Sequence, residues 1–325
     1  MKRISFFMMG TVLLFSGALF FNSCSEDPII PTLDFIAEPT GYEVDITVEA
    51  TDAASYTWNY GDGTSSTAVG SHKYTYKQSG TYTIAATVTS SDGNTATKSV
   101  SVTISASMEE MLSGGPAAAN GKTWIMNVQA TAGKDGGGIV ANDIPIHPSF
   151  SLVPDNVLSL FGLGAEYGDE FTFKHDGTYK IDLKNGRALA GIVYGTLIDP
   201  NVIPSDDWGS LPLSAATYAV PAGGTWSLDK ANYTVAAFNE FTGATEPENV
   251  TFTFPETDTK KKARLKLSTG QYFGVLDLFA NQHPALVIIK EITADKVHIA
   301  IGMNSYPEHI DKPSLMLHIT MVPKK

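Results

Sequence analysis

The chain has 325 residues, of which 43% are hydrophobic and 17% are charged, and its formal net charge is −12 at pH 7. Such an acidic chain offers no basic field to neutralise phosphates, which argues against nucleic acid as a partner and against electrostatic binding to anionic lipid. A single cysteine cannot form an intramolecular disulfide, so packed cores must supply the stability, and the length suffices for two or three domains.

Residues 1–23 have the three zones of a secretion signal: two basic residues, an apolar run, and a short approach to a cleavage site. They precede Cys24, and the junction resembles a lipobox, whose cysteine becomes diacylated after cleavage. We therefore predict a lipoprotein whose membrane contact is the lipid on Cys24. The apolar run is also near the minimum length of a membrane helix, so an uncleaved anchor and ordinary secretion are the alternatives.

Residues 24–32 are predicted to be the acylated N-terminus and a tether. They include the acidic tract at residues 25–27 (SED). This tract is similar to the tag that sends some lipoproteins of Gram-negative glycan-degrading bacteria to the outer face of the outer membrane. We therefore expect a protein anchored in the outer membrane and exposed at the cell surface, and a solvated linker is the alternative.

Residues 33–105 are predicted to form a small antiparallel sandwich, because β-branched and polar residues alternate between Asp-Gly turn signals. Three blocks, at residues 58–63 (WNYGDG), 72–76 (HKYTY) and 80–84 (GTYTI), resemble the signature of the PKD domain in order and spacing. The resemblance implies an immunoglobulin-like β-sandwich. It also implies a spacer or interaction module, so we do not expect this domain to carry chemistry.

Two residues of this domain have specific predicted roles. Trp58 alternates with Tyr60 along one strand, so both side chains should enter the core. Asp62 should cap the following turn through its carboxylate, with Gly61 and Gly63 allowing the tight backbone. A ligand or calcium contact is the alternative for Trp58 and Asp62.

Residues 106–120 are predicted to be a linker that contains one short helical turn. Ser107 and Glu110 have the spacing of a capping box, in which each side chain accepts from the backbone N–H of the other residue at the helix start. The sequence GGP at residues 114–116 should end this turn.

Residues 121–325 are predicted to form one larger antiparallel β-sandwich, jelly-roll-like, so the fold class is all-β. A short helix is expected within 152–163, capped by Asp155. The expected strands lie at residues 122–128, 170–174, 178–183, 192–197, 224–228, 233–238, 250–254, 264–267, 286–291, 296–301 and 315–321.

Four segments of this part, at residues 121–124 (GKTW), 167–173 (YGDEFTF), 176–179 (DGTY) and 265–268 (LKLS), carry a second resemblance. They are similar to the C-terminal domain of surface lipoproteins that follow PKD modules in polysaccharide-utilisation systems. Several such proteins hold glycans on β-sandwiches, so the resemblance implies a polysaccharide ligand.

No motif in the sequence predicts catalysis, a metal site or a cofactor. A glycosidase needs two carboxylates across the scissile bond, and the spacing of Glu166, Asp169 and Glu170 does not match the Glu-x-Asp-x-x-Glu strand of laminarinase-type enzymes. The histidines do not form a His-Glu-x-x-His helix, and His298 and His318 fall within expected strands. We therefore predict a protein that is not an enzyme.

Trp208 is the strongest candidate for ligand binding. It lies in a polar, turn-rich segment that offers nothing local to bury its indole, and Asp206 and Asp207 beside it supply acceptors for sugar hydroxyls. Tyr272 and Tyr306 are weaker candidates. For Trp208 the alternative is an indole folded back onto its own domain.

These observations together predict a lipid-tethered surface protein in which the PKD domain holds a C-terminal β-sandwich away from the membrane to bind a polysaccharide. The alternative is a structural or protein-interaction subunit of an envelope complex, with other envelope proteins as partners. A glycoside hydrolase-like enzyme is a third interpretation.

Overall fold

A computed structural model describes residues 27–129, 145–146, 149–151, 155–191, 199–206, 213–238, 246–254, 262–277, 284–304 and 312–325. The predicted signal peptide and Cys24 lie outside these ranges. The chain separates into two compact units, and the second includes Ala37–Asp45 and Lys73–Tyr82 together with Ser101–Lys325. Within the described ranges, none of the helices has the length and hydrophobicity needed to span a bilayer.

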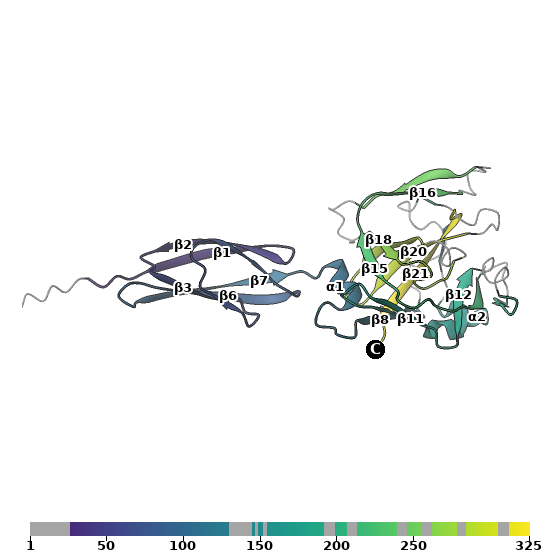
Figure 1. Cartoon of the computed structure of the whole chain (residues 1–325), viewed down its shortest axis with the longest axis horizontal. Helices are drawn as coiled ribbons and strands as arrows, with labels where there is room; N and C mark the ends of the chain where they lie inside the picture. The colour runs from purple at the N-terminus through teal and green to yellow at the C-terminus, as the bar shows by residue number, and fades with distance from the viewer. Residues whose placement is uncertain are drawn as a thin grey trace, which may run out of the picture. The chain divides into compact units, whose positions relative to one another are not determined.

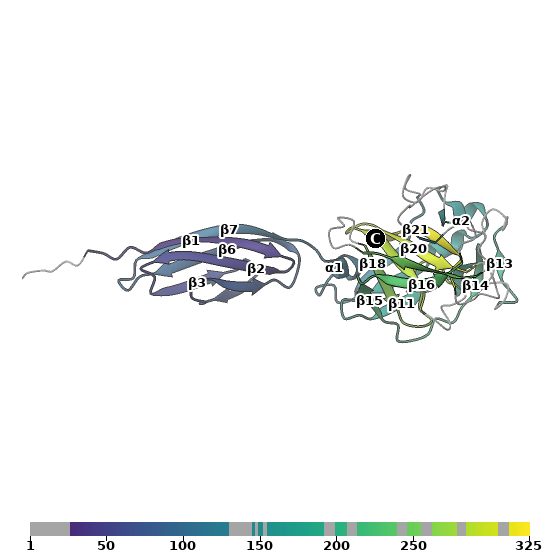
Figure 2. The same cartoon turned by 90° about the horizontal axis from the view of Figure 1, so that it is seen from above.

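The N-terminal part consists of two sheets, with the strand orders β1-β2-β5 and β4-β3-β6-β7 (Figures 1 and 2). Alternate residues of each strand enter the space between the sheets, as Ile84, Ala86 and Val88 of β6 show, because successive side chains of a strand point to opposite faces. The strands are β1 (Thr32–Thr40), β2 (Glu43–Thr51), β3 (Ser55–Asn59), β4 (Ser65–Ser66), β5 (His72–Thr75), β6 (Gly80–Thr89) and β7 (Thr95–Ile104).

Trp58 on β3 fills this core, and its side chain has no exposed surface. Its ring meets the rings of Phe35 and His72 edge-on, with centroid distances of 5.2 and 4.8 Å. The indole Nε1 donates to the carbonyl oxygen of Ala68 at 2.9 Å, so the polar atom of this buried aromatic is satisfied. The predicted core position of Trp58 is confirmed.

The turn after β3 is closed by Asp62. Its Oδ1 accepts from the backbone N of Thr64 at 3.0 Å and from the Thr64 hydroxyl at 2.7 Å. Gly61 has a φ of 79°, and a Cβ at this position would lie 2.7 Å from the carbonyl oxygen of Thr83. The predicted cap is therefore confirmed, and the turn requires glycine at residue 61.

A short helix, α1 (Met108–Ser113), follows the first sandwich, as predicted. Ser107 is its N-cap, and its hydroxyl accepts from the backbone N of Glu110 at 3.0 Å. The Glu110 carboxylate does not complete the predicted capping box. It accepts from the hydroxyl of Tyr42 and from the hydroxyl of Ser79, the latter at 2.9 Å. Only the serine half of the box is formed, because these hydroxyls occupy the glutamate.

The C-terminal domain is built on a nine-stranded sheet with the order β11-β10-β8-β21-β20-β19-β18-β15, with β9 also pairing with β21. The β9–β21 pair is parallel and the other described pairs of this sheet are antiparallel. The strands are β8 (Lys122–Met126), β9 (Ser149–Ser151), β10 (Glu170–Phe173), β11 (Tyr179–Asp182), β15 (Trp226–Asp229), β18 (Ala263–Leu267), β19 (Val287–Ile292), β20 (Val297–Met303) and β21 (Leu315–Pro323).

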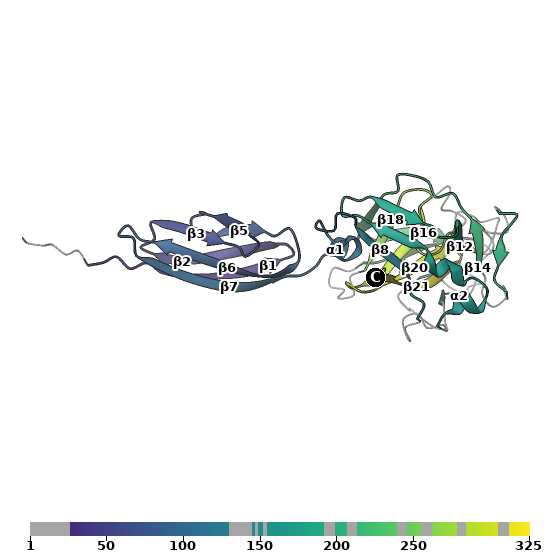
Figure 3. The same cartoon turned by 90° about the horizontal axis from the view of Figure 1, so that it is seen from below.

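The main core lies on one face of this sheet. There, side chains such as Ile299 and Leu317 join one cluster with residues of a small three-stranded sheet, β12-β14-β13. This sheet and the helix α2 lie together at one end of the domain (Figures 1 and 3). The elements are β12 (Arg187–Gly191), β13 (Ile203–Pro204), β14 (Leu213–Thr217), α2 (Val157–Leu160) and the 3-10 helix η1 (Gly164–Gly168).

The opposite face of the nine-stranded sheet carries a second, smaller core. Ile288, Ala300 and Met316 point to this face and pack with Phe252. Phe252 belongs to a hairpin of β16 (Tyr233–Ala237) and β17 (Glu248–Phe252), which forms a separate two-stranded sheet (Figure 1). The domain is therefore an antiparallel β-sandwich with layers on both faces of its central sheet.

The sequence-based strands agree with most of this framework, and the predicted all-β class is confirmed. Ten of the eleven expected strands overlap strands of the structure, and the remaining one, at residues 192–197, lies outside the described residues. The short helix expected within 152–163 is α2. It begins at Val157 with Asn156 as N-cap in the left-handed region and without a side-chain capping bond, so the predicted cap by Asp155 is wrong.

Candidate ligand-binding site

Of the residues predicted to bind a ligand, Trp208, Asp207 and Tyr306 lie outside the described residues. Asp206 is described and is exposed. Its backbone N donates to the carbonyl oxygen of Phe161 at 3.1 Å, so the loop before Trp208 is held beside the segment after α2. The Asp206 carboxylate is therefore accessible, as the prediction requires, while its role as a ligand contact stays a prediction.

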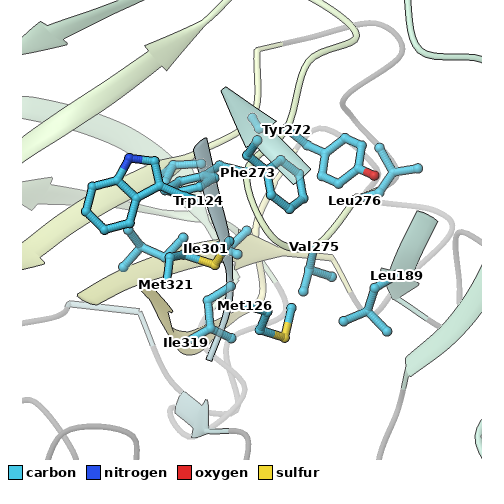
Figure 4. Close-up of a cluster of buried hydrophobic side chains, with 14 of the residues drawn as sticks. Trp124, Met126, Leu189, Tyr272, Phe273, Val275, Leu276, Ile301, Ile319 and Met321 are labelled. Carbon is cyan, nitrogen blue, oxygen red and sulfur yellow. The ribbon is translucent and has the colours of Figure 1, made fainter. Parts of the chain in front are cut away.

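The position of Tyr272 corrects the prediction of an exposed ligand-binding side chain. Tyr272 has no exposed surface, and its ring lies among buried hydrophobic side chains of the main core (Figure 4). Its centroid is 5.6 Å from that of Phe171 and 5.9 Å from that of Tyr218, and both pairs are edge-on. A ring packed in this way offers no face to a ligand from solution, so Tyr272 is a core residue.

The strand histidines are also buried in the sheet. His298 and His318 are 6% and 2% exposed, and the Thr320 hydroxyl lies 2.7 Å from Nδ1 of His298. In the part of the chain that the structure describes, no three His, Cys, Asp or Glu side chains come together as a metal site. Both histidines therefore occupy strand positions, as expected.

A pocket of about 360 Å³ lies on the face of the central sheet that carries the hairpin β16–β17. Its lining combines an aromatic ring and apolar side chains with three charged groups, which is the usual composition of a small-molecule site. The described lining residues are Tyr233, Val235, Arg264, Leu265, Lys266, Leu267, Asp277, Pro284, Ala285, Leu286, Gly302 and Pro313.

The charged residues reach the pocket because of the period of two along β18. Leu265 and Leu267 belong to the main core, so Arg264 and Lys266, which alternate with them, point to the opposite face. The alternation of leucine with basic residues is visible in the sequence and predicted the strand. It did not reveal the pocket, because the second wall comes from Tyr233 on the distant hairpin.

The Arg264 guanidinium is held in a defined position in this pocket. Its central carbon lies 3.7 Å from the ring centroid of Tyr233, and Nη2 donates to Oδ2 of Asp229 at 2.7 Å. A cation over an aromatic face is attracted by the ring quadrupole, so the two side chains stabilise each other's orientation. Arg264 and Tyr233 thus form a preorganised wall of the pocket.

The acidic side of the pocket is supplied by Asp277. Its side chain is 5% exposed, and Oδ1 accepts from the backbone N of Asn304 at 3.1 Å. A buried carboxylate that holds a backbone N–H is positioned by the fold. Of the described residues that line the pocket, Asp277 is the only one with a carboxylate.

A second group of acidic residues lies near η1, and none of its members is among the described residues that line the pocket. Burial raises the pKa of Asp169 to about 7, and the neighbouring carboxylates of Glu166 and Asp182 add to the rise. Oδ1 of Asp169 accepts from the backbone N of Lys184 at 3.2 Å, and Glu166 accepts from the amide of Asn185 at 2.9 Å. Both carboxylates therefore hold the turn after β11.

Glu170, the other acidic residue considered as a catalyst, is the first residue of β10, which lies between β11 and β8, and it is held by ion pairs. Lys324 and Lys184 bring Nζ within 2.5 and 2.9 Å of its Oε1. Partial burial would raise the pKa of Glu170, but the hydrogen bonds and charges of the two lysines outweigh it and lower the pKa. An ionised carboxylate engaged in this way is suited to holding the C-terminal strand.

Comparison with known proteins identifies the N-terminal sandwich. Residues 31–104 match the family model described as PKD domain. The chain therefore contains a PKD domain followed by a larger β-sandwich domain. No curated protein matches this sequence.

Similar solved structures include two PKD domains. The PKD1 domain of Vibrio anguillarum Epp is 25% identical and aligns over 25% of this chain and 100% of its own, with a TM-score of 0.24. The PKD1 domain of the Vibrio cholerae metalloprotease PrtV is also 25% identical and aligns over 23% of this chain and 98% of its own, with a TM-score of 0.22.

A third similar structure comes from work on promiscuous carbohydrate-binding modules of the β-sandwich superfamily. It is 17% identical and aligns over 72% of this chain and 88% of its own, with a TM-score of 0.26. A TM-score this low does not establish a common fold, so what that protein binds is not transferred to this chain.

Proposed function

We propose that the chain is a lipid-anchored protein of the outer membrane surface that binds a polysaccharide through its C-terminal β-sandwich, with the PKD domain as spacer. The observation that carries the binding role is the pocket between β18 and the hairpin β16–β17. It presents the Tyr233 ring and apolar side chains beside Arg264, Lys266 and Asp277.

This combination suits a sugar for a physical reason. A pyranose has an apolar face of C–H groups and a rim of hydroxyls, so it is bound by an aromatic or apolar surface with polar groups beside it. Tyr233 and Leu286 supply apolar surface, and Arg264, Lys266 and Asp277 supply donors and acceptors. Trp208, Asp206, Asp207 and Tyr306 are proposed as further contacts along an extended ligand.

The proposed role is to bind a polysaccharide without catalysing a reaction on it. Glycoside hydrolysis by the common mechanism needs two carboxylates facing each other across the scissile bond. The described lining of the pocket contributes one carboxylate, Asp277, and that group already holds the backbone of Asn304. Glu166 and Asp169 hold the turn after β11, so their oxygens are engaged in the fold.

Affinity electrophoresis of the full chain in gels that contain single polysaccharides, neutral and acidic, tests this function. We expect retardation in at least one gel and about a tenfold loss of affinity in Tyr233→Ala, because an aromatic contact of this kind contributes about 1–1.5 kcal/mol. Tyr56→Ala is the matched control, since Tyr56 is a half-buried tyrosine of the PKD domain. Unretarded migration in every gel contradicts the proposed function.

A further inference from the structure

We propose that the pocket selects a saccharide that carries an anionic group, a carboxylate or a sulfate ester, and that Lys266 with Arg264 binds this group. The inference rests on the proposed polysaccharide-binding function and names the class of ligand. The proposal follows from the balance of hydrogen-bond donors and acceptors in the pocket and from the position of Arg264 and Lys266 on the same face of β18.

The pocket is rich in donors. Arg264 and Lys266 together carry eight N–H donors and no acceptor, whereas Asp277 supplies the one described carboxylate. The hydroxyls of a neutral sugar are satisfied by a mixture of acceptors and donors. A carboxylate or a sulfate group offers acceptors only, so it matches a donor-rich wall and forms charge-assisted hydrogen bonds with it.

Arg264 retains unused donor capacity in this arrangement. Nη2 is bonded to Asp229, but the buried Nε of Arg264 has no hydrogen-bond partner in the part of the chain that the structure describes. The buried Nε is closed to a ligand from solution, so the donors that Arg264 can present to the pocket are those of its Nη atoms. The stacking on Tyr233 fixes the plane of the guanidinium, so a ligand would meet donors that are already oriented.

Lys266 supplies the charge for the anion. It is exposed, and no described carboxylate forms a salt bridge with it. The Asp229 carboxylate pairs directly with Arg264 and acts on Lys266 only through its charge at longer range. Residues two apart on one strand lie about 7 Å from each other on the same face, so both long side chains can reach one anionic group. The pocket thus combines an oriented guanidinium with an available ammonium.

The charge of the whole chain makes this selectivity testable. The formal net charge is −12, so a polyanion is repelled by the molecule at long range and is not expected to bind by general attraction. Binding of an acidic polysaccharide therefore requires a local site. The salt dependence should be shallow, because one or two cations make the contact.

The test uses the full chain in affinity gels that contain polygalacturonate, dextran sulfate, or neutral dextran and galactan. We expect retardation by polygalacturonate or dextran sulfate and not by the neutral polymers, and the polymer that retards shows whether a carboxylate or a sulfate is preferred. Lys266→Gln should weaken this retardation at least about tenfold, and Lys266→Arg should restore most of it.

Lys180→Gln is the matched control, because Lys180 is another exposed lysine on a strand of the same domain. It should leave retardation unchanged, and all three variants should keep the melting temperature of the unmodified chain. Equal losses in Lys266→Gln and Lys180→Gln overturn the inference. Retardation by neutral polymers alone overturns it while the proposed function stands, whereas no retardation in any gel overturns both.

Discussion

Asp169 is a carboxyl group whose ionisation opposes the folded state. Its pKa in the folded protein is about 7, because burial disfavours the charged form, whereas an unfolded chain has an aspartate pKa of about 3.9. Between these values the folded state binds more protons than the unfolded state. The contribution of Asp169 to the free energy of unfolding is therefore most favourable below about pH 4, and it is lost as the pH rises toward 7.

Asp169→Asn should remove this pH dependence. A shift of one pKa unit corresponds to about 1.4 kcal/mol, so the variant should gain a few kcal/mol relative to the unmodified chain between pH 4.5 and 7.5. The amide oxygen can still accept from the backbone N of Lys184. Chemical denaturation of the C-terminal domain at three pH values measures the difference, and equal pH slopes in both proteins would contradict the assignment.

Asp182→Asn is the control with the opposite sign. The Lys184 ammonium lowers the pKa of Asp182 through a hydrogen bond and its charge, so the contribution of Asp182 is present at neutral pH and is lost as the pH falls below about 4. Because this carboxylate is about half exposed, the effect should be small. Asp182→Asn should therefore act on stability mainly below about pH 4. Between pH 4.5 and 7.5 it should weaken the pH dependence only slightly, through the small rise that Asp182 adds to the pKa of Asp169, whereas Asp169→Asn should remove that dependence.

At the scale of elements, the hairpin β16–β17 depends on its packing. A two-stranded sheet is marginal in water by itself, and Phe252 joins it to Ile288, Ala300 and Met316 of the central sheet. Phe252→Ala should lower the stability of this packing by about 3–5 kcal/mol and release the hairpin from the sheet. The pocket would then lose one of its walls. Hydrogen exchange should then show lost protection in β16 and β17 and unchanged protection in β20 and β21.

Thr251→Ala is the matched control for this element. Thr251 is exposed on the same strand, and its hydroxyl makes only an exposed cross-strand hydrogen bond with the Thr234 hydroxyl, so its loss should change stability by no more than about 1 kcal/mol. Phe252→Ala should also abolish polysaccharide retardation, and Thr251→Ala should not. If β20 and β21 lose protection together with the hairpin, the second core is not an independent layer and the expectation is wrong.

The sequence predicted elements well where β-branched and aromatic residues alternate, as in β20 and β21. It missed β12 and β14, whose segments RALAG and LSAAT are rich in small residues with weak strand preference. They are strands because they pair with each other, with Ala188 opposite Ala216, and because they cover the main core. Such pairing joins distant segments and leaves no local signal.

The same limit explains the candidate site. The strand with Arg264 and Lys266 could be predicted, but the pocket exists because a hairpin some thirty residues earlier in the chain folds over that face. Tyr272 was misjudged for a related reason. It follows the turn at Gly270, whose φ is 82°, and turn residues suggest exposure, yet its ring reaches the core beside Phe171. The period of hydrophobic residues along a strand and the residues of its turns do not indicate which face of the sheet a second layer will cover.

At the scale of the whole molecule, the predicted independence of residues 33–105 from the rest of the chain can be tested at Trp58. Trp58 is fully buried in a sandwich of some seventy residues, where loss of a large aromatic costs about 3–5 kcal/mol and small domains have little stability to spare. Trp58→Ala should unfold this sandwich and leave the calorimetric transition of the C-terminal domain nearly unchanged. A joint shift of both transitions would show that the predicted linker at residues 106–120 does not separate two independent domains.

The membrane anchor is the broadest of the proposals, and it depends on one residue. Because Cys24 is the only cysteine of the chain, lipid attached through a cysteine sulfur can be located nowhere else. Two acyl chains hold a protein on a bilayer stably, whereas a single chain gives marginal binding. Cys24→Ala should therefore abolish metabolic labelling with palmitate and release the protein from the membrane fraction. Ser25→Ala, at the next position, should leave both the labelling and the membrane association unchanged.

Labelling that survives in Cys24→Ala contradicts the lipoprotein proposal. Membrane retention without labelling favours an uncleaved N-terminal helix, because that segment would then hold the protein without lipid.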